Sequence, residues 1–453
     1  MPPKPTQQLL AHIADRRYEH WPPEALDSCK IFVLDTLGVA LSGSRVPMVR
    51  VLHEVTDDWG RGQEARVIGT AEKVTLRAAA ALNSYQIHNQ EWDSVHEPAV
   101  VHPMAVVLAS LLARADTAHD VSGKAFINAC CTAVDVACTI GAASRNKLRF
   151  FRPAMCGALG ATAGLAQLAG LTPGATHSAL GLAYSQLSGT MQAHIEGSDM
   201  LPLQIAFNAR AVFDAIALAQ RDVIGPLNFL EGPFGYFALI DPEWSPEPFN
   251  ELGRVAQITR LSHKPYPSGR ATHGGIDGAL QLQQRLGFRA IDVAELLVFA
   301  PPLVRQLVDR VPRTDMLPAY ARLCLPYVVA TALLTGNVGV EDFTPELIAD
   351  AARQDLAGRI RVLPDANPAP NALVPQRVEI SLRDGRTGSV DLPAVLGAPD
   401  RPLTAEQHFA KFRRAAHSGL RPLPLNEVDA LIACVNRLEK LTDVSELFNH
   451  LAF

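Results

Sequence analysis

Residues 83–103 read NSYQIHNQEWDSVHEPAVVHP, and the rest of the chain is best interpreted outward from them. Three histidines and three carboxylates fall within this stretch, namely His88, His96, His102, Glu91, Asp93 and Glu97. Long alanine- and leucine-rich stretches lie on both sides. Titratable side chains concentrated between apolar helices are typical of a buried reaction site. A solvated connection between two helices is the alternative, but Trp92 and the apolar run at 99–101 disfavour it.

Length, charge and cysteine use exclude several classes of protein. A chain of 453 residues predicts two or three domains with large cores. The net charge of −5 and the lack of any Lys/Arg cluster argue against nucleic acid as a partner. The first residues lack the apolar core of a signal peptide, and no long apolar run suggests a membrane span. The seven cysteines form no CxxC pair, so we expect buried thiols in a reducing, cytoplasmic compartment.

Helical periodicity dominates the first half of the chain. We expect helices near 23–42, 74–87, 103–113, 123–143 and 154–169. Pro103 suits a first helical position and leaves His102 as the cap, at the positive end of that helix, where a carboxylate would be favoured. The pattern predicts an all-helical domain over residues 1–254, to which C-terminal helices in 400–453 return.

Residues 255–399 have a different pattern and predict a smaller α+β domain. Strands are expected at 254–262, 294–302 and 358–363, and Asp384-Gly385 predicts a hairpin between 377–382 and 388–392. Helices are expected at 270–286 and 319–334, the second kinked at Pro326. The proline-rich loop 364–375 should be exposed. The expected fold class is therefore mainly α, with a large all-helical domain and a smaller α+β lid domain.

Several separate stretches resemble one family. DTLGVALSGS at 35–44, the stretch 83–103, LEGPFGYFAL at 230–239, KPYPSGRATHGG at 264–275 and PLTAEQHFAKFRRAA at 402–416 are similar, in this order, to segments of the MmgE/PrpD superfamily. Its members include 2-methylcitrate dehydratases, cis-aconitate decarboxylases and iminodisuccinate epimerases. The resemblance implies a helical domain, a lid, a cleft between them, a homodimer, and neither a metal ion nor any other cofactor. The lack of GxGxxG, P-loop or metal-ligand motifs agrees with this.

The resemblance also implies which residues form the site. Chemistry next to a carboxylate needs a base for the carbon-bound proton, an acid, and positive groups that hold the carboxylates of the substrate. The catalytic residues expected from these positions are Asp93, His102 and Lys264. The residues expected to bind a small polycarboxylate substrate are Glu91, His96, Arg152, Gln204, Arg270, His273 and Tyr327. For Arg270 a structural salt bridge is an equal alternative, and His273 and Tyr327 also suit core positions.

The sequence departs from the family pattern within residues 91–95, where the first acid is lengthened to Glu91, and at two later positions. Where the decarboxylases of the family read DFDDT, this chain reads EWDSV at 91–95, so Val95 replaces the threonine. A histidine of those enzymes appears here as Arg152, and a lysine as Leu201. These changes argue against a cis-aconitate decarboxylase and weigh against a 2-methylcitrate dehydratase.

The function expected from the sequence is a cofactor-independent lyase of the hydratase/dehydratase type. It would act on a small di- or tricarboxylic acid through proton abstraction next to a carboxylate. An epimerase or isomerase of a dicarboxylate such as iminodisuccinate is the first alternative. A non-catalytic polycarboxylate-binding protein is the second.

Overall fold

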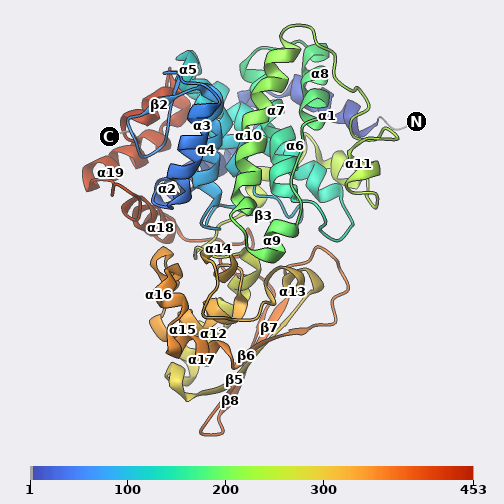
Figure 1. Ribbon diagram of the computed structural model, residues 1–453. Coiled ribbons are helices and arrows are strands. Elements are labelled where there is room, and N and C mark those ends of the chain that lie inside the picture. Colours follow the sequence, from blue (N-terminus) through green and yellow to red (C-terminus); the bar gives the residue numbers. More distant parts are fainter. Residues whose placement is uncertain (1–3, 452–453) are drawn as a thin grey trace.

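Helices account for most of the structure, a computed structural model that describes residues 4–451. Figure 1 shows two lobes: a larger one built from the N-terminal helices together with the C-terminal helices, and a smaller one that contains a sheet. The mainly α fold with a smaller α+β part is as the sequence predicts. We call these parts the helical lobe (α1–α11, α18 and α19) and the sheet lobe (α12–α17 and β5–β8).

The helical lobe is assembled from apolar helices that the periodicity largely predicts. Its helices are α1 (Pro5–Asp15), α2 (Pro23–Gly43), α3 (Met48–Asp58), α4 (Leu76–His88), α5 (Pro103–Ala118), α6 (Gly123–Ala143), α7 (Arg152–Leu168), α8 (Pro173–Tyr184), α9 (Gln192–Glu196), α10 (Met200–Ala219), α11 (Tyr236–Leu239), α18 (Ala405–His417) and α19 (Leu425–Asn436). A short ribbon of β1 (Ala65–Arg66) and β2 (Lys73–Val74) precedes α4. By length and composition α6 and α10 could each cross a membrane, but both are packed largely inside the helical lobe.

Small residues allow these helices to approach one another closely. α5 and α6 both pack against α7, and α4 packs against α2, α5 and α10. A Cβ atom at Gly43, the last residue of α2, would lie 1.9 Å from the carbonyl oxygen of Gln86 on α4. Only glycine therefore permits this contact, which fixes the end of α4 and the loop that follows it.

The loop between α4 and α5 contains two residues other than glycine with positive φ angles. Glu91 and Val100 adopt left-handed backbone conformations with φ of 53° and 52°. Such a conformation is costly for a β-branched residue such as Val100, and it persists only where surrounding packing enforces it. The short strand β3 (Val95–His96) in this loop pairs antiparallel with β4 (Leu261–Ser262), which joins the loop to a segment more than 150 residues away.

The sheet lobe is organised around four strands in the order β6-β5-β7-β8. Its elements are α12 (His273–Leu286), β5 (Val293–Ala300), α13 (Pro302–Val308), α14 (Pro318–Ala321), α15 (Leu325–Thr335), α16 (Pro345–Ile348), α17 (Ala351–Ala357), β6 (Ile360–Pro364), β7 (Gln376–Leu382) and β8 (Thr387–Leu392). β5 pairs in parallel with β6 and antiparallel with β7. α12 packs on β7 and β8, and α15 packs on α12 and β6.

Two local predictions are wrong. Residues 257–260 form a 3-10 helix, so only Leu261 and Ser262 of the expected strand at 254–262 are extended. The alternating pattern is misleading there because buried Gln257 donates its backbone N–H to the Asp135 carboxylate, over 2.7 Å. Pro326 causes no kink: α14 ends at Ala321, and Pro326 lies in the first turn of α15, a position that proline favours.

Candidate active site

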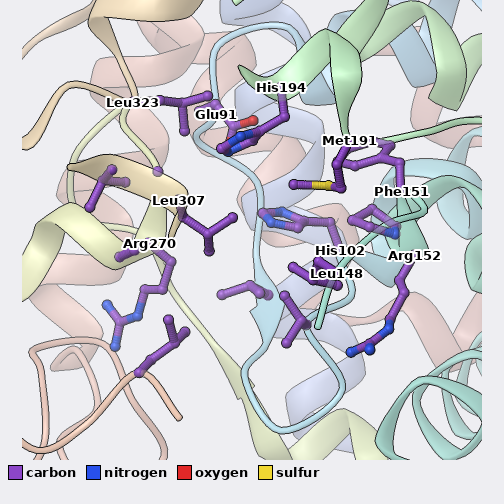
Figure 2. A pocket seen from close by; sticks show the side chains of 17 residues that line it. Glu91, His102, Leu148, Phe151, Arg152, Met191, His194, Arg270, Leu307 and Leu323 are labelled. Carbon is purple, nitrogen blue, oxygen red and sulfur yellow. The ribbon is translucent and has the colours of Figure 1, made fainter. Parts of the chain in front are cut away.

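A cavity lies where loops of the helical lobe meet the start of α12 and the end of α13. The space between its side chains, including the part open to solvent, is about 570 Å³. The lining residues are Glu91, Val95, Val100, His102, Leu148, Phe151, Arg152, Pro153, Met191, His194, Gly269, Arg270, Ala271, Leu307, Val308, Leu323 and Leu373. The stretch at 83–103 therefore contributes to the cavity wall, together with segments of both lobes (Figure 2).

Asp93 is the centre of a buried cluster beneath this cavity. Its side chain is fully buried, and its Oδ2 lies 3.0 Å from Nδ1 of His88 and 3.2 Å from Nδ1 of His102. Burial alone would raise the pKa of Asp93, but the two imidazoles hold it well below its usual range. An ionised carboxylate can only accept hydrogen bonds. His88 therefore carries hydrogen on Nδ1, and the negative charge of Asp93 favours the same tautomer in His102.

The two imidazoles around Asp93 differ in basicity. Burial opposes protonation of His88, but the carboxylates of Asp93 and Glu91 raise its pKa above the usual value. Burial and the ammonium group of Lys264 lower the pKa of His102, and Asp93 only partly offsets them. At neutral pH His102 is therefore the uncharged imidazole of the pair. With Nδ1 facing Asp93, its Nε2 lone pair is free, and its ring points into the cavity (Figure 2). This is the arrangement of a general base oriented by a carboxylate.

Lys264 neutralises the acidic side of the cluster. Its fully buried Nζ donates to Oε2 of Glu91 over 2.9 Å and to the backbone oxygen of Glu91 over 3.1 Å. It also lies 3.9 Å from Oδ1 of Asp93. Burial would raise the pKa of Glu91, but Lys264 and the two histidines lower it to about 2. The β3–β4 pairing ends two residues before Lys264, and this explains how the KPYP segment reaches the loop after α4.

Two long helices begin at the cavity wall. His102 is the N-cap of α5, and Phe151 is the N-cap of α7, with Pro103 and Pro153 in the first turns. The unpaired N–H groups and the dipole of a helix N-terminus favour bound anions. At α7 the N–H groups of Arg152 and Ala154 already donate to backbone carbonyls and Pro153 has none, so only the helix dipole acts there. The two N-termini thus contribute positive potential to the cavity wall.

Two arginines expected to bind substrate line the cavity but are engaged elsewhere. Arg152 donates from Nη2 to Oγ of Ser144 over 2.5 Å and to the carbonyl of Asn146 over 3.0 Å. Arg270 donates to Oε1 of Glu97 over 2.8 Å and to the carbonyl of Leu396 over 2.7 Å. In Figure 2 both guanidinium groups point away from His102. Arg270 thus makes the structural salt bridge that the sequence left as an alternative.

The other four expected substrate-binding residues lie outside the cavity lining. His96 lies 3.0 Å from Oε1 of Gln257, and burial lowers its pKa to about 4. Gln204 accepts from the backbone N–H of Thr190, over 2.6 Å. His273 contacts the backbone oxygen of Ser268. Tyr327 donates to the carbonyl of Asp342, over 2.5 Å. These four side chains hold the backbone around the site in place.

The structure adds His88 and His194 to the site. His88 is the last residue of α4. Its position in the sequence, five residues before Asp93, is the feature from which its place in the site could have been predicted. His194 is on the short helix α9, whose sequence gives no indication of a role. Its imidazole lies beside Glu91 in Figure 2, and burial together with Arg310 lowers its pKa to about 3. His194 is therefore also uncharged at neutral pH.

Two clusters among the described residues have donor types that suit a divalent cation. They are His88, Asp93 and His102, and Asp35, His263 and His408. In the first cluster, Nδ1 of His88 is hydrogen-bonded to Asp93, and Nδ1 of His102 lies 3.2 Å from the same carboxylate oxygen. In the second, the ammonium group of Lys411 lies 2.7 Å from Oδ1 of Asp35 and already balances its charge. Neither cluster therefore needs a metal ion to explain its geometry.

The buried pair of Asp35 and Lys411 stabilises the loop between α4 and α5, which carries Asp93. Lys411, on α18, also donates to the carbonyl oxygen of Trp92 over 3.1 Å, directly before Asp93 in the chain. His263, which precedes Lys264, lies with His408 in the same cluster as Asp35. One set of buried contacts thus holds both segments that carry catalytic residues.

We expect Lys411→Met to lower the free energy of unfolding by about 3–5 kcal/mol, because it leaves Asp35 charged and uncompensated in the core. Urea unfolding followed by circular dichroism measures this. Lys124→Met is the control, since the Lys124 side chain is 54% exposed and its pair with Glu19 is long, at 3.7 Å. Equal stability of the two variants would contradict the role given to Lys411.

Two family models together match most of the chain. Residues 7–248 match the MmgE/PrpD N-terminal domain, and residues 266–436 match the MmgE/PrpD C-terminal domain. The cis-aconitate decarboxylase-like protein oryM of Aspergillus oryzae is 26% identical, over 98% of this chain and 96% of its own. A cis-aconitate decarboxylase of Aspergillus terreus is also 26% identical, over 94% of this chain and 92% of its own.

Proposed function

Because the chain belongs to the MmgE/PrpD family, we propose that it is a lyase that acts on a small carboxylic acid by proton transfer at the carbon next to a carboxylate. The observation that carries the proposal is the neutral His102, whose Nδ1 faces Asp93 and whose ring points into the cavity. Relatives that are cis-aconitate decarboxylases or similar to one, and that match over nearly the whole chain, support lyase chemistry.

In the proposed step, Nε2 of His102 removes the carbon-bound proton, and the electron pair of the broken C–H bond moves onto the neighbouring carboxylate. The resulting enediolate carries extra negative charge. The N-termini of α5 and α7 stabilise that charge, and so does the ammonium group of Lys264 behind Glu91. Asp93 keeps the imidazole in the reactive tautomer and stabilises the imidazolium that forms.

Dehydration is our first proposal for the full reaction. The enediolate electrons form a carbon–carbon double bond, the β-hydroxyl group leaves, and the imidazolium of His102 returns the proton to it as water departs. In a decarboxylation the order differs: loss of CO₂ generates the carbanion, and His102, after it has taken up a proton from solvent, protonates it. In both reactions the proton is carried by Nε2 of His102. We also propose a homodimer in the cytoplasm, with exposed apolar side chains such as Phe234 and Ile224 available for an interface.

Proton NMR in D₂O with 2-methylcitrate, citrate, cis-aconitate, itaconate and iminodisuccinate tests the proposal. We expect deuterium at the carbon next to a carboxylate in at least one compound. An alkene identifies dehydration, CO₂ identifies decarboxylation, and inversion without loss identifies epimerisation. If the acids bind but neither exchange nor products occur, the protein is a binding protein and the lyase proposal is wrong.

A further inference from the structure

The wall of the active-site cavity is largely apolar. Opposite the histidines it is formed by side chains from separate parts of the chain, including Leu148, Met191, Leu307, Val308 and Leu373. Figure 2 shows Leu307, Leu148 and Met191 around the ring of His102. A cavity built for citrate-like acids alone would not need such a surface, since those ligands carry charge along their whole length.

Few positive groups line the same cavity. Arg152 and Arg270 are the arginines in its lining. Both donate to protein partners and point away from His102, but Nε and Nη1 of Arg152 have no hydrogen-bond partner among the described residues. His102 and His194 have lowered pKa values, by burial first, and are uncharged at neutral pH. Besides the N-termini of α5 and α7, the positive groups beside the cavity include Lys264 and the more basic His88, and both already pair with the carboxylates of Glu91 and Asp93.

A tricarboxylate would place one of its carboxylates against the apolar part of this wall. One or two can lie at the helix N-termini near His102, but another would be buried against leucine, valine and methionine without a charged partner. A hydrocarbon group at that place would instead gain from burial.

We propose that the substrate is a mono- or dicarboxylic acid that carries a hydrocarbon substituent of several carbon atoms, held by the apolar wall. Calling the ligand a substrate rests on the proposed function. The binding preference does not depend on that function. An apolar wall could also serve merely to exclude water around a small polar acid. The two cases differ in one respect. If the wall holds a hydrocarbon group, affinity must rise with the length of that group.

Isothermal titration calorimetry with three unreactive acids tests this. The acids are succinate, 2-butylsuccinate and propane-1,2,3-tricarboxylate. Each methylene group that becomes fully buried on binding raises the affinity about fourfold. We expect 2-butylsuccinate to bind at least about tenfold more tightly than succinate, and the tricarboxylate to bind no more tightly than succinate.

Variants locate the preference in the cavity. Leu307→Asn and, independently, Leu373→Asn should lower the preference for the butyl group to about threefold or less, with little change in succinate affinity. The control is Leu317→Asn, because Leu317 is 53% exposed and lies outside the cavity lining. It should keep the full preference.

Equal affinity for succinate and 2-butylsuccinate, tighter binding of the tricarboxylate, or no binding of 2-butylsuccinate would overturn the inference. So would a butyl preference that survives both cavity variants. If the butyl preference is found but no acid exchanges deuterium, the inference stands and the lyase proposal fails. The two proposals can therefore fail separately.

Discussion

Replacement of His102 by glutamine is expected to lower kcat by about 10²–10⁴-fold with little change in KM. Glutamine keeps a polar side chain of similar size at the N-cap of α5 but offers no basic nitrogen. The N-termini of α5 and α7 remain, so substrate should still bind. Steady-state kinetics on the substrate identified by NMR measures the two parameters.

The control for this variant is His417→Gln, at an exposed histidine on α18. It should retain the kinetic constants of the parent protein. A His102→Gln variant with a kcat within about threefold of the parent would show that another group removes the proton.

The second large effect is expected for Lys264→Met, with kcat/KM lowered by about 10² or more at neutral pH. The ammonium group of Lys264 lowers the pKa values of both Glu91 and His102. Without it, both pKa values rise. A larger fraction of His102 is then protonated at neutral pH and cannot act as a base. The loss should therefore be greatest at acidic pH, and part of the activity should return as the pH rises.

The variant also leaves two buried carboxylates with less compensation, so its fold must be checked by circular dichroism. Lys264→Arg is the matched variant, since it keeps the positive charge but alters the reach to Glu91. It should retain the pH profile of the parent more closely than Lys264→Met does. If Lys264→Met is folded and the acidic limb of its pH–activity profile is not shifted, that result would contradict the electrostatic role of Lys264.

The parts of the fold that follow from local patterns could be predicted. Apolar periodicity located α2, α4, α5 and α6, and Asp384-Gly385 located the β7–β8 hairpin. Proline at 103 located the start of α5 and placed His102 at its N-terminus. Each of these features depends on residues close together in the chain. The expected strand at 254–262 failed because a distant partner, Asp135, decided the backbone there.

The site could be predicted only in part for the same reason. Asp93, His102 and Lys264 meet because β3 pairs with β4, and the resemblance to known enzymes, not periodicity, pointed to all three. The direction of an arginine side chain depends on partners that periodicity does not identify, and for Arg270 these are more than 100 residues away. Arg152 faces Ser144 and Asn146, and Arg270 faces Glu97 and a carbonyl at Leu396. No local pattern reveals those partners.

The central claim is that one carboxylate, Asp93, holds a neutral imidazole at His102 and a more basic one at His88. The most direct measurement is a pH titration of the histidine rings by heteronuclear NMR, with His102→Gln and His88→Gln used to assign the two signals. The account predicts that His102 titrates below pH 6.5 and His88 above it. A His102 ring that stays protonated through pH 7 could not serve as the base, and that result would contradict the account.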